Sequence, residues 1–182
     1  MSTAVTAVVF VALFASHQVG DHIVQTSAAA QAKGAPTADL LAAGVHPWRG
    51  WGACLHHVST YTLTQAAALV LVNVATPVAW TAVLAALAVS ASTHAVIDRR
   101  WLVRLIVRAK GCQDWQEAPY AIDQSLHTGA MLVAAVVAAV TTSGAGACAV
   151  GAGAAALVGI ALVVEQRLAT AARDRAASTS GG

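Results

Sequence analysis

Three pairs of histidine and aspartate stand four residues apart in this chain of 182 residues. The pairs are His17 with Asp21, His94 with Asp98, and, in reverse order, Asp123 with His127. Side chains four residues apart share one face of an α-helix, so each pair presents an imidazole beside a carboxylate. Both groups ligate divalent metals such as Zn, Mn and Fe. The pairs therefore predict a polar site for metal or proton chemistry.

The composition around these pairs is that of a membrane protein. The chain is 58% hydrophobic and 10% charged, whereas a soluble domain carries roughly 25% charged residues. A net charge of +2 is too small to indicate a nucleic-acid partner. Cys54, Cys112 and Cys148 are isolated, so we expect small apolar side chains rather than a thiolate metal site or a disulfide framework.

Five apolar stretches are long enough to cross a hydrocarbon core of roughly 30 Å. They are residues 4–26, 52–74, 78–98, 118–141 and 147–166. We therefore predict an all-α fold, a polytopic membrane helix bundle of about five transmembrane helices in a single domain, residues 1–168. A signal peptide is the alternative for the first stretch. No basic residue precedes that stretch, and His17, Asp21 and His22 interrupt its end, which argues against this alternative.

Two segments outside these stretches have distinct patterns. In residues 99–112, Arg100, Arg104 and Arg108 recur every four residues, and apolar residues fill the opposite side. This pattern predicts a short basic cytoplasmic helix that lies on the membrane against anionic headgroups. A helical extension of the third span is the alternative. The polar residues 169–182 predict a disordered cytoplasmic tail.

The basic residues predict an orientation. All ten lysines and arginines follow the first, third or fifth span, and the other connections carry none. The positive-inside rule then places the chain in the inner (plasma) membrane with its amino terminus outside and its carboxyl terminus in the cytoplasm. Each His/Asp pair lies at the cytoplasmic end of its span. The second span begins there with His56 and His57. Either could face the site, and the ligand set below takes His57. Four helices thus bring imidazoles and carboxylates to a similar depth.

The convergent residues favour a metal-dependent hydrolase or lipid-modifying enzyme. The predicted ligands of a divalent metal are His17, Asp21, His57, His94, Asp98, Asp123 and His127. A bound metal lowers the pKa of its water, and a carboxylate takes the proton, for which Asp98 and Asp123 are the catalytic candidates. Arg99, Arg100 and Arg104 are the candidates for binding a substrate phosphate or lipid headgroup.

Two other interpretations stay open. The same groups would suit a proton or cation relay in a transporter, although few polar residues continue toward the outer side. They would also suit a scaffold in which polar pairs only fix the packing of the helices. Gln25 and Gln124 are candidates to orient the ligands. We expect Glu165 to be a surface or snorkelling carboxylate.

The motifs also resemble those of a known family. The run from Phe14 to Thr26 resembles the "AHxxxDxxxQT" opening of the domain-of-unknown-function family 3307, which comprises small bacterial and phage membrane proteins. The family's later "HxxxD" and "DQxxH" motifs resemble His94 to Asp98 and Asp123 to His127. The resemblance covers the first four spans and implies membrane location and a shared polar site, without implying an activity. A looser likeness to membrane-bound metal-dependent hydrolases rests on His-x-x-x-Asp alone and is an analogy.

Overall fold

The structure, a computed structural model, describes residues 3–180, and these contain helices but no strand. Five helices are long and apolar enough to cross a membrane. They are α1 (Thr3–Val19) with the π-helix η1 (Gly20–Val24), α4 (Trp51–Ala75), α5 (Trp80–Asp98), α7 (Ala118–Val140) and α8 (Gly144–Ser180). The predicted all-α bundle with five candidate spans is confirmed.

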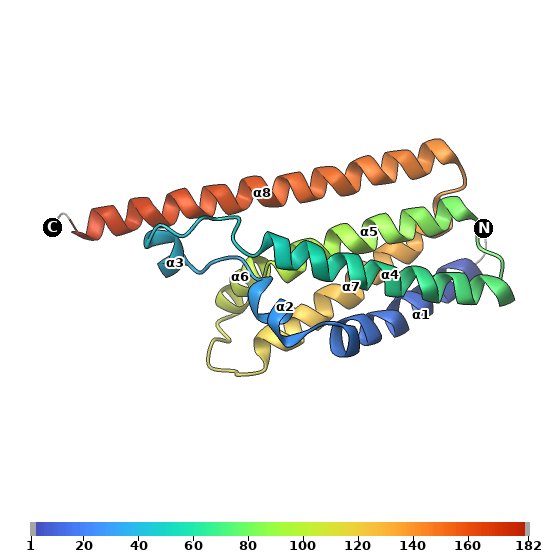
Figure 1. The fold of residues 1–182 in the computed structure, drawn as a ribbon, viewed down its shortest axis with the longest axis horizontal. Helices are drawn as coiled ribbons and strands as arrows, with labels where there is room; N and C mark the ends of the chain where they lie inside the picture. Colours follow the sequence, from blue (N-terminus) through green and yellow to red (C-terminus); the bar gives the residue numbers. More distant parts are fainter. Residues whose placement is uncertain (1–2, 181–182) are drawn as a thin grey trace.

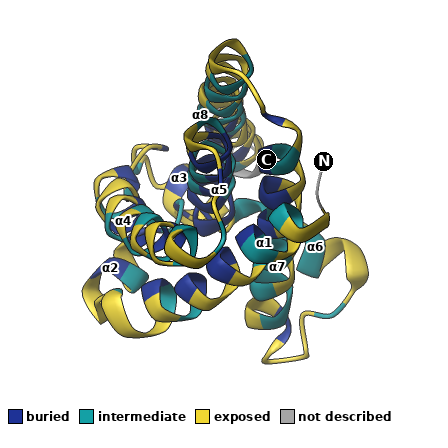
Figure 2. Cartoon of the chain, turned by 90° about the vertical axis from the view of Figure 1, so that its right-hand side faces the viewer, coloured by how far each residue is buried: buried dark blue, intermediate teal, exposed yellow. Residues whose placement is uncertain are grey.

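The long helices alternate in direction along the chain (Figure 1). Short connections join α4 to α5 and α7 to α8 at one end, and short helix connections produce antiparallel neighbours. Viewed along the bundle, α5 lies among the other long helices (Figure 2). It packs against α4, α7 and α8, while α1 packs against α4 and α7. The central helix α5 therefore packs against three of the other four long helices, more than any of the others does.

An apolar core fills the end of the bundle with the short connections. Val9, Leu13, Leu69, Val83 and Met131 are buried there among alanines. Small alanine side chains let the helices approach closely, which is how membrane helices pack. Large apolar side chains are also exposed on the outer faces of these helices, among them Val11, Leu71 and Val140, as in helices surrounded by lipid.

The other end of the bundle carries the longer connections and three short helices. These are α2 (Ser27–Ala32), α3 (Ala38–Ala42) and α6 (Trp101–Lys110). Thr26 and Thr37 begin α2 and α3, and each hydroxyl accepts a hydrogen bond from a backbone N–H of the first turn. All ten lysines and arginines lie in these connections, in α6 or in the second half of α8. We call this the basic end of the bundle (Figure 1).

The predicted amphipathic helix is present as α6, and it is separate from α5. Arg100 precedes it with φ of 62°, a left-handed conformation that is uncommon outside glycine. This residue breaks the path of α5, so α6 is not an extension of the third span. Gly111 ends α6 with φ of 63°, the usual left-handed glycine cap.

The prediction of a disordered tail is wrong for the described part of residues 169–182. Helix α8 continues to Ser180 without a break. Ala169 and Ala172 are buried against Leu41 of α3, and Arg173 Nε donates to the Leu41 carbonyl at 3.4 Å. Alanine has the highest helix propensity, and this contact with α3 provides packing that the polar composition did not indicate.

Candidate metal site

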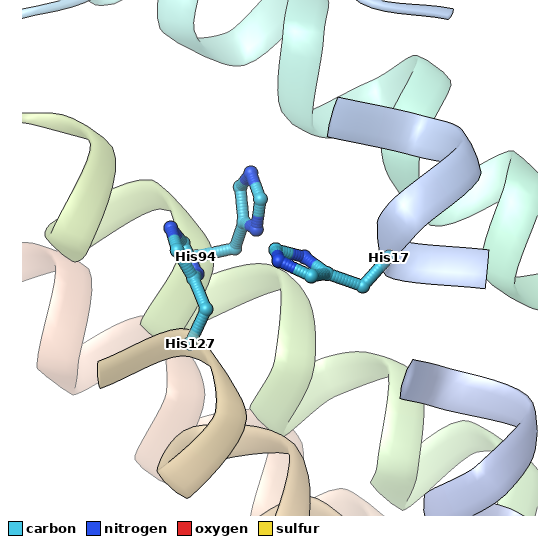
Figure 3. Close-up of side chains that lie close together, drawn as sticks. All are labelled: His17, His94 and His127. Atoms are coloured by element: carbon cyan, nitrogen blue, oxygen red, sulfur yellow. The ribbon is translucent and has the colours of Figure 1, made fainter. Parts of the chain in front are cut away.

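Four long helices each direct one histidine into the interior near the basic end. His17, His57, His94 and His127 come from α1, α4, α5 and α7, and none is more than 2% exposed. The rings of His17, His94 and His127 lie close together (Figure 3). Ring centroids are 5.0 Å apart for His17 and His127 and 4.3 Å apart for His94 and His127. His56 is exposed, so His57 is the histidine of α4 that faces the others.

Two aspartates flank the histidine pair of α4 and α5. Asp21 Oδ1 lies 3.2 Å from His57 Nε2 and 3.4 Å from His94 Nε2. Asp98 Oδ2 lies 3.4 Å from His57 Nε2 and 3.1 Å from His94 Nε2. The two Nε2 atoms are themselves 3.0 Å apart. Two nitrogens and two oxygens, supplied by η1, α4 and α5, thus form a small group of metal-ligating atoms.

A second group of ligating atoms adjoins the first. His127 Nε2 lies 3.7 Å from Asp98 Oδ1 and 3.7 Å from Asp123 Oδ2. The three ligating atoms that Asp98, Asp123 and His127 offer lie within 4.8 Å of one another, as do those of His17, His94 and His127. All seven predicted ligands therefore meet at one place. We call these seven residues the His/Asp cluster.

Several polar atoms of the His/Asp cluster are buried without a hydrogen bond. Within the described residues, no contact with hydrogen-bond geometry forms at His17 Nδ1, His127 Nε2 or Asp98 Oδ2, although Asp98 Oδ2 lies 3.1 Å from His94 Nε2. Buried polar groups in proteins nearly always have partners, and each exception calls for an explanation. The unused atoms belong to the groups that a metal would bind.

The π-helix η1 explains how Asp21 reaches this cluster. Sequence spacing predicts His17 and Asp21 side by side on a regular helix. In the structure the helix widens at Gly20–Val24, and Asp21 is closer to His57 than to His17, whose Nδ1 lies 3.8 Å from Asp21 Oδ2. Single π-helical turns occur frequently at functional sites. Gly20 is required here, because a Cβ atom would lie 2.8 Å from Tyr61 Cδ2.

Polar residues support the cluster and extend it into the bundle. Gln124 Oε1 lies 3.2 Å from His17 Nε2, and Gln124 Nε2 donates to Asp123 Oδ2. The Tyr61 ring stacks on His94 with centroids 3.8 Å apart. Gln65 Nε2 donates to the Tyr61 hydroxyl at 2.6 Å. Gln124 therefore has the orienting position that the sequence suggested, whereas the sequence analysis missed Tyr61 and Gln65.

Lys33 is a third residue of the site that the sequence did not reveal. It follows α2, is only 5% exposed, and places Nζ 2.7 Å from Asp98 Oδ1. A buried ammonium needs such a carboxylate partner. The sequence offers one signal for this role. The chain has only two lysines, and Lys33 is the one that follows the His17–Asp21 motif in the next connection.

A pocket of about 410 Å³ opens beside the His/Asp cluster. Both carboxylates and cationic side chains line it, and one such pair, Lys33 and Asp98, is in contact. The carboxylates are Asp21, Asp98 and Asp123, and the cations are Lys33, Arg100 and Arg104. The volume lies within the range of small-ligand sites. Two of the three arginines assigned to a substrate phosphate thus line this pocket.

Arg99 does not line the pocket, and its predicted role is corrected. Its side chain is fully buried, and Arg99 Nε donates to Glu165 Oε1 at 2.7 Å. The carbonyls of Lys33 and Arg49 accept from its terminal nitrogens at 2.8 and 2.9 Å. Trp51 Nε1 donates to Glu165 Oε2 at 2.8 Å. We call Arg99, Glu165 and Trp51 the Arg99 cluster.

The expectation for Glu165 is also wrong. It is 3% exposed and pairs with Arg99, so it is not a surface or snorkelling carboxylate. Helix α8 runs beside α5, and this places Glu165 against the residue that follows α5. The sequence distance between the partners concealed the pair.

Comparison with known proteins gives one match. No curated protein and no solved structure matches the chain. The model of the family described as "Protein of unknown function (DUF3307)" matches residues 9–150. The match includes all seven residues of the His/Asp cluster together with Lys33, Arg100 and Arg104. It covers most of the chain, and the protein therefore belongs to the DUF3307 family.

Proposed function

We propose that the His/Asp cluster binds one or two divalent metal ions and that the protein is a metal-dependent hydrolase or lipid-modifying enzyme of the membrane. One observation carries the proposal. Five of the six separations among Asp21 Oδ1, His57 Nε2, His94 Nε2 and Asp98 Oδ2 are 3.0 to 3.4 Å; only the one between the two carboxylates is not among them. Ligands about 2.0–2.1 Å from a tetrahedral ion lie about 3.3 Å from one another. The ligating atoms of Asp21, His57 and His94 therefore have the spacing of three ligands of one ion, and Asp98 Oδ2 has that spacing to both histidines.

The chemistry of the ligands supports Zn, Mn or Fe. Mixed imidazole and carboxylate ligands suit these ions better than soft metals. A divalent ion would supply a water of lowered pKa at the cluster. Asp98 is occupied by His94 and Lys33, so we assign it to binding. Asp123 has a side chain that is 22% exposed and lines the pocket, and we assign it the role of proton acceptor.

We place the basic end of the bundle at the cytoplasmic face of the inner membrane. The ten basic residues support this orientation through the positive-inside rule. The amino terminus then lies outside and the carboxyl terminus lies in the cytoplasm. The His/Asp cluster would face the inner leaflet, within reach of lipid headgroups.

A proton relay is the second candidate, and one observation favours it. The Tyr61 hydroxyl lies 3.4 Å from Ser90 Oγ and accepts a hydrogen bond from Gln65 Nε2. Polar contacts therefore continue beyond the histidines. Past Gln65 the interior is the apolar core around Leu69 and Met131. A conducting path requires polar groups across the full depth of the membrane. We therefore rank the relay below the metal site.

The metal content of the purified full-length protein tests the proposal. We expect about one or two equivalents of a transition metal in the wild-type protein, and the same content in His56→Ala, which changes an exposed histidine beside the cluster. The double variant His94→Ala/Asp123→Ala should lose the metal. Thermal unfolding in detergent confirms that the variants are folded, and His94→Gln serves if the double variant is not. A folded double variant with full metal content would refute the metal site.

A further inference from the structure

Side chains of both charges line the pocket beside the His/Asp cluster, and Lys33 is paired with one of the carboxylates. Asp21, Asp98 and Asp123 bound it toward the histidines. Arg100 and Arg104 bound it from the side of α6. A ligand that fills this pocket must satisfy both parts. A phosphate does so when a divalent ion stands between it and the carboxylates, because the ion reverses the local charge.

The arginines of this wall have unused capacity for an anion. Arg100 donates to the Ala30 carbonyl at 2.9 Å and Arg104 to the Pro36 carbonyl at 3.3 Å. In residues 3–178 neither side chain forms an ion pair with a carboxylate. A guanidinium has five N–H donors, so these carbonyls leave several available. Partial burial and the nearby charges of Arg100 and Arg99 lower the pKa of Arg104, and a bound anion would relieve that repulsion.

The backbone holds Arg100 in this position. The left-handed φ of 62° at Arg100 turns the chain out of the direction of α5 just before α6 begins. Gly34 lies beneath the side chain, where a Cβ atom would come within 3.3 Å of Arg100 Cδ. Arg100 is exposed to solvent, but one side of its side chain packs against the connection that carries Lys33, which restricts its position.

The rim of the pocket is suited to a lipid. Tyr120 lines it and is 61% exposed, and its ring lies 6.4 Å from that of His22. Ile23 follows His22 in the chain; it lies outside the lining of the pocket and is 76% exposed. Both side chains belong to segments at the ends of membrane-spanning helices. Exposed aromatic and apolar residues at that level contact the interface between acyl chains and headgroups.

We infer that this pocket binds the phosphate-bearing headgroup of a membrane lipid, with the phosphate between Arg100, Arg104 and the metal that the carboxylates hold. The inference rests on the proposed function, because Lys33 offsets only one of the three carboxylates, and these repel a phosphate unless a further cation covers them. It assigns the substrate class of the enzyme as a phospholipid or a phosphorylated lipid intermediate. Arg99 has no part in it, since each nitrogen of its guanidinium already donates to Glu165 or to a backbone carbonyl.

Calorimetric titration of the full-length protein in a phosphate-free maltoside detergent tests this inference. The protein is loaded with Mn²⁺, and three probes are compared: dioctanoyl phosphatidic acid, inorganic phosphate, and dioctanoylglycerol, which has the same chains without phosphate. The variants are Arg100→Gln and Arg104→Gln. Arg108→Gln is the matched control, because Arg108 lies on the same helix and does not line this pocket. Metal content is measured for every variant.

We expect phosphatidic acid to bind the wild-type protein more tightly than either other probe. Each of Arg100→Gln and Arg104→Gln should weaken that binding by about tenfold or more, the loss typical of a hydrogen bond to a charged group. Arg108→Gln should bind as the wild type does, and all variants should retain the metal. Removing Mn²⁺ from the wild-type protein should weaken binding at least as much as either substitution.

Three results would overturn the inference in distinguishable ways. Equal affinities in Arg100→Gln, Arg104→Gln and Arg108→Gln, with metal retained, would remove the phosphate from this pocket and leave the metal site intact. Inorganic phosphate binding as tightly as phosphatidic acid, with the same dependence on Arg100, would make the ligand a soluble phosphate. Absence of bound metal in the wild-type protein would refute the proposed function. If that metal-free protein bound phosphatidic acid tightly, the role assigned to the metal in lipid binding would be refuted as well.

Discussion

Two buried polar clusters lie at the basic end of the bundle, and two adjacent residues of the chain belong to different clusters. Asp98 belongs to the His/Asp cluster and Arg99 to the Arg99 cluster. The guanidinium of Arg99 donates to both oxygens of Glu165 and to three backbone carbonyls. The His/Asp cluster instead retains buried atoms without hydrogen bonds and opens on a pocket. One cluster is complete within the chain, and the other has capacity left for a ligand.

This difference separates a structural role from a functional one. The Arg99 cluster joins α8, the start of α4 and the connection that carries Lys33, all of which are far apart in sequence. A fully paired buried charge fixes the arrangement of the elements that it joins, and losing one partner leaves the other charge uncompensated. We therefore expect changes in the Arg99 cluster to affect folding and changes in the His/Asp cluster to affect ligand binding.

The largest effect should follow Arg99→Ala. The change leaves Glu165 buried without its cation, and breaking such a pair costs about 3–5 kcal/mol. We expect a markedly lower midpoint of thermal unfolding, followed by circular dichroism in detergent, or loss of the folded protein. Arg49→Ala is the control, since the Arg49 side chain is exposed and only its carbonyl contacts Arg99.

The paired change Arg99→Leu/Glu165→Leu sharpens this test. Removing both charges avoids an unpaired buried group, so the double variant should recover part of the lost stability. A single variant Arg99→Ala that unfolds at the wild-type midpoint would show that the Arg99 cluster does not hold the fold together.

The same comparison shows what the sequence could predict. Local patterns predict the five spans, the amphipathic helix and the His/Asp cluster. These patterns are the hydrophobic runs, the four-residue spacing of histidine and aspartate, and the alternating direction of successive spans. Each pattern is read within one segment, and antiparallel packing of neighbouring segments then brings the motifs together. The His/Asp cluster was predictable because all of its members lie at the ends of spans.

The remainder depends on contacts that no local pattern encodes. Lys33 and Glu165 reach their partners from a connection and from the last helix, over 65 and 66 positions of sequence. Arg99 and Arg100 are adjacent and identical in type, and the left-handed turn at Arg100 separates their directions. One of them is buried in an ion pair and the other lines the pocket. The π-helical turn at Asp21 likewise depends on tertiary packing around Gly20.

A smaller effect, confined to the metal, should follow Gln124→Leu. Gln124 contacts both His17 and Asp123, and removing a residue that orients metal ligands typically weakens metal binding about 10–100-fold. The unfolding midpoint of the metal-free protein should change little. Competition with a chelator of known affinity measures the change, and Ser125→Ala, at an exposed neighbouring position, is the control. Equal metal affinities in the two variants would exclude Gln124 from the support of the site.

The smallest effect should have the opposite sign, and it tests whether the His/Asp cluster is a cation site at all. Lys33 places an ammonium 2.7 Å from Asp98, next to the space that a divalent ion would occupy, so the two positive charges compete for one carboxylate. Lys33→Met keeps the length of the side chain and removes its charge. We expect metal to bind about three- to tenfold more tightly, a modest gain because the flexible lysine can withdraw and solvent in the pocket screens the repulsion. Metal titration with a competing chelator measures it, with Lys110→Met at the end of α6 as the control. Weaker metal binding in Lys33→Met would show that the ammonium supports the cluster rather than competing with its cation. The His/Asp cluster would then resemble the Arg99 cluster, as a set of charges that the chain completes by itself.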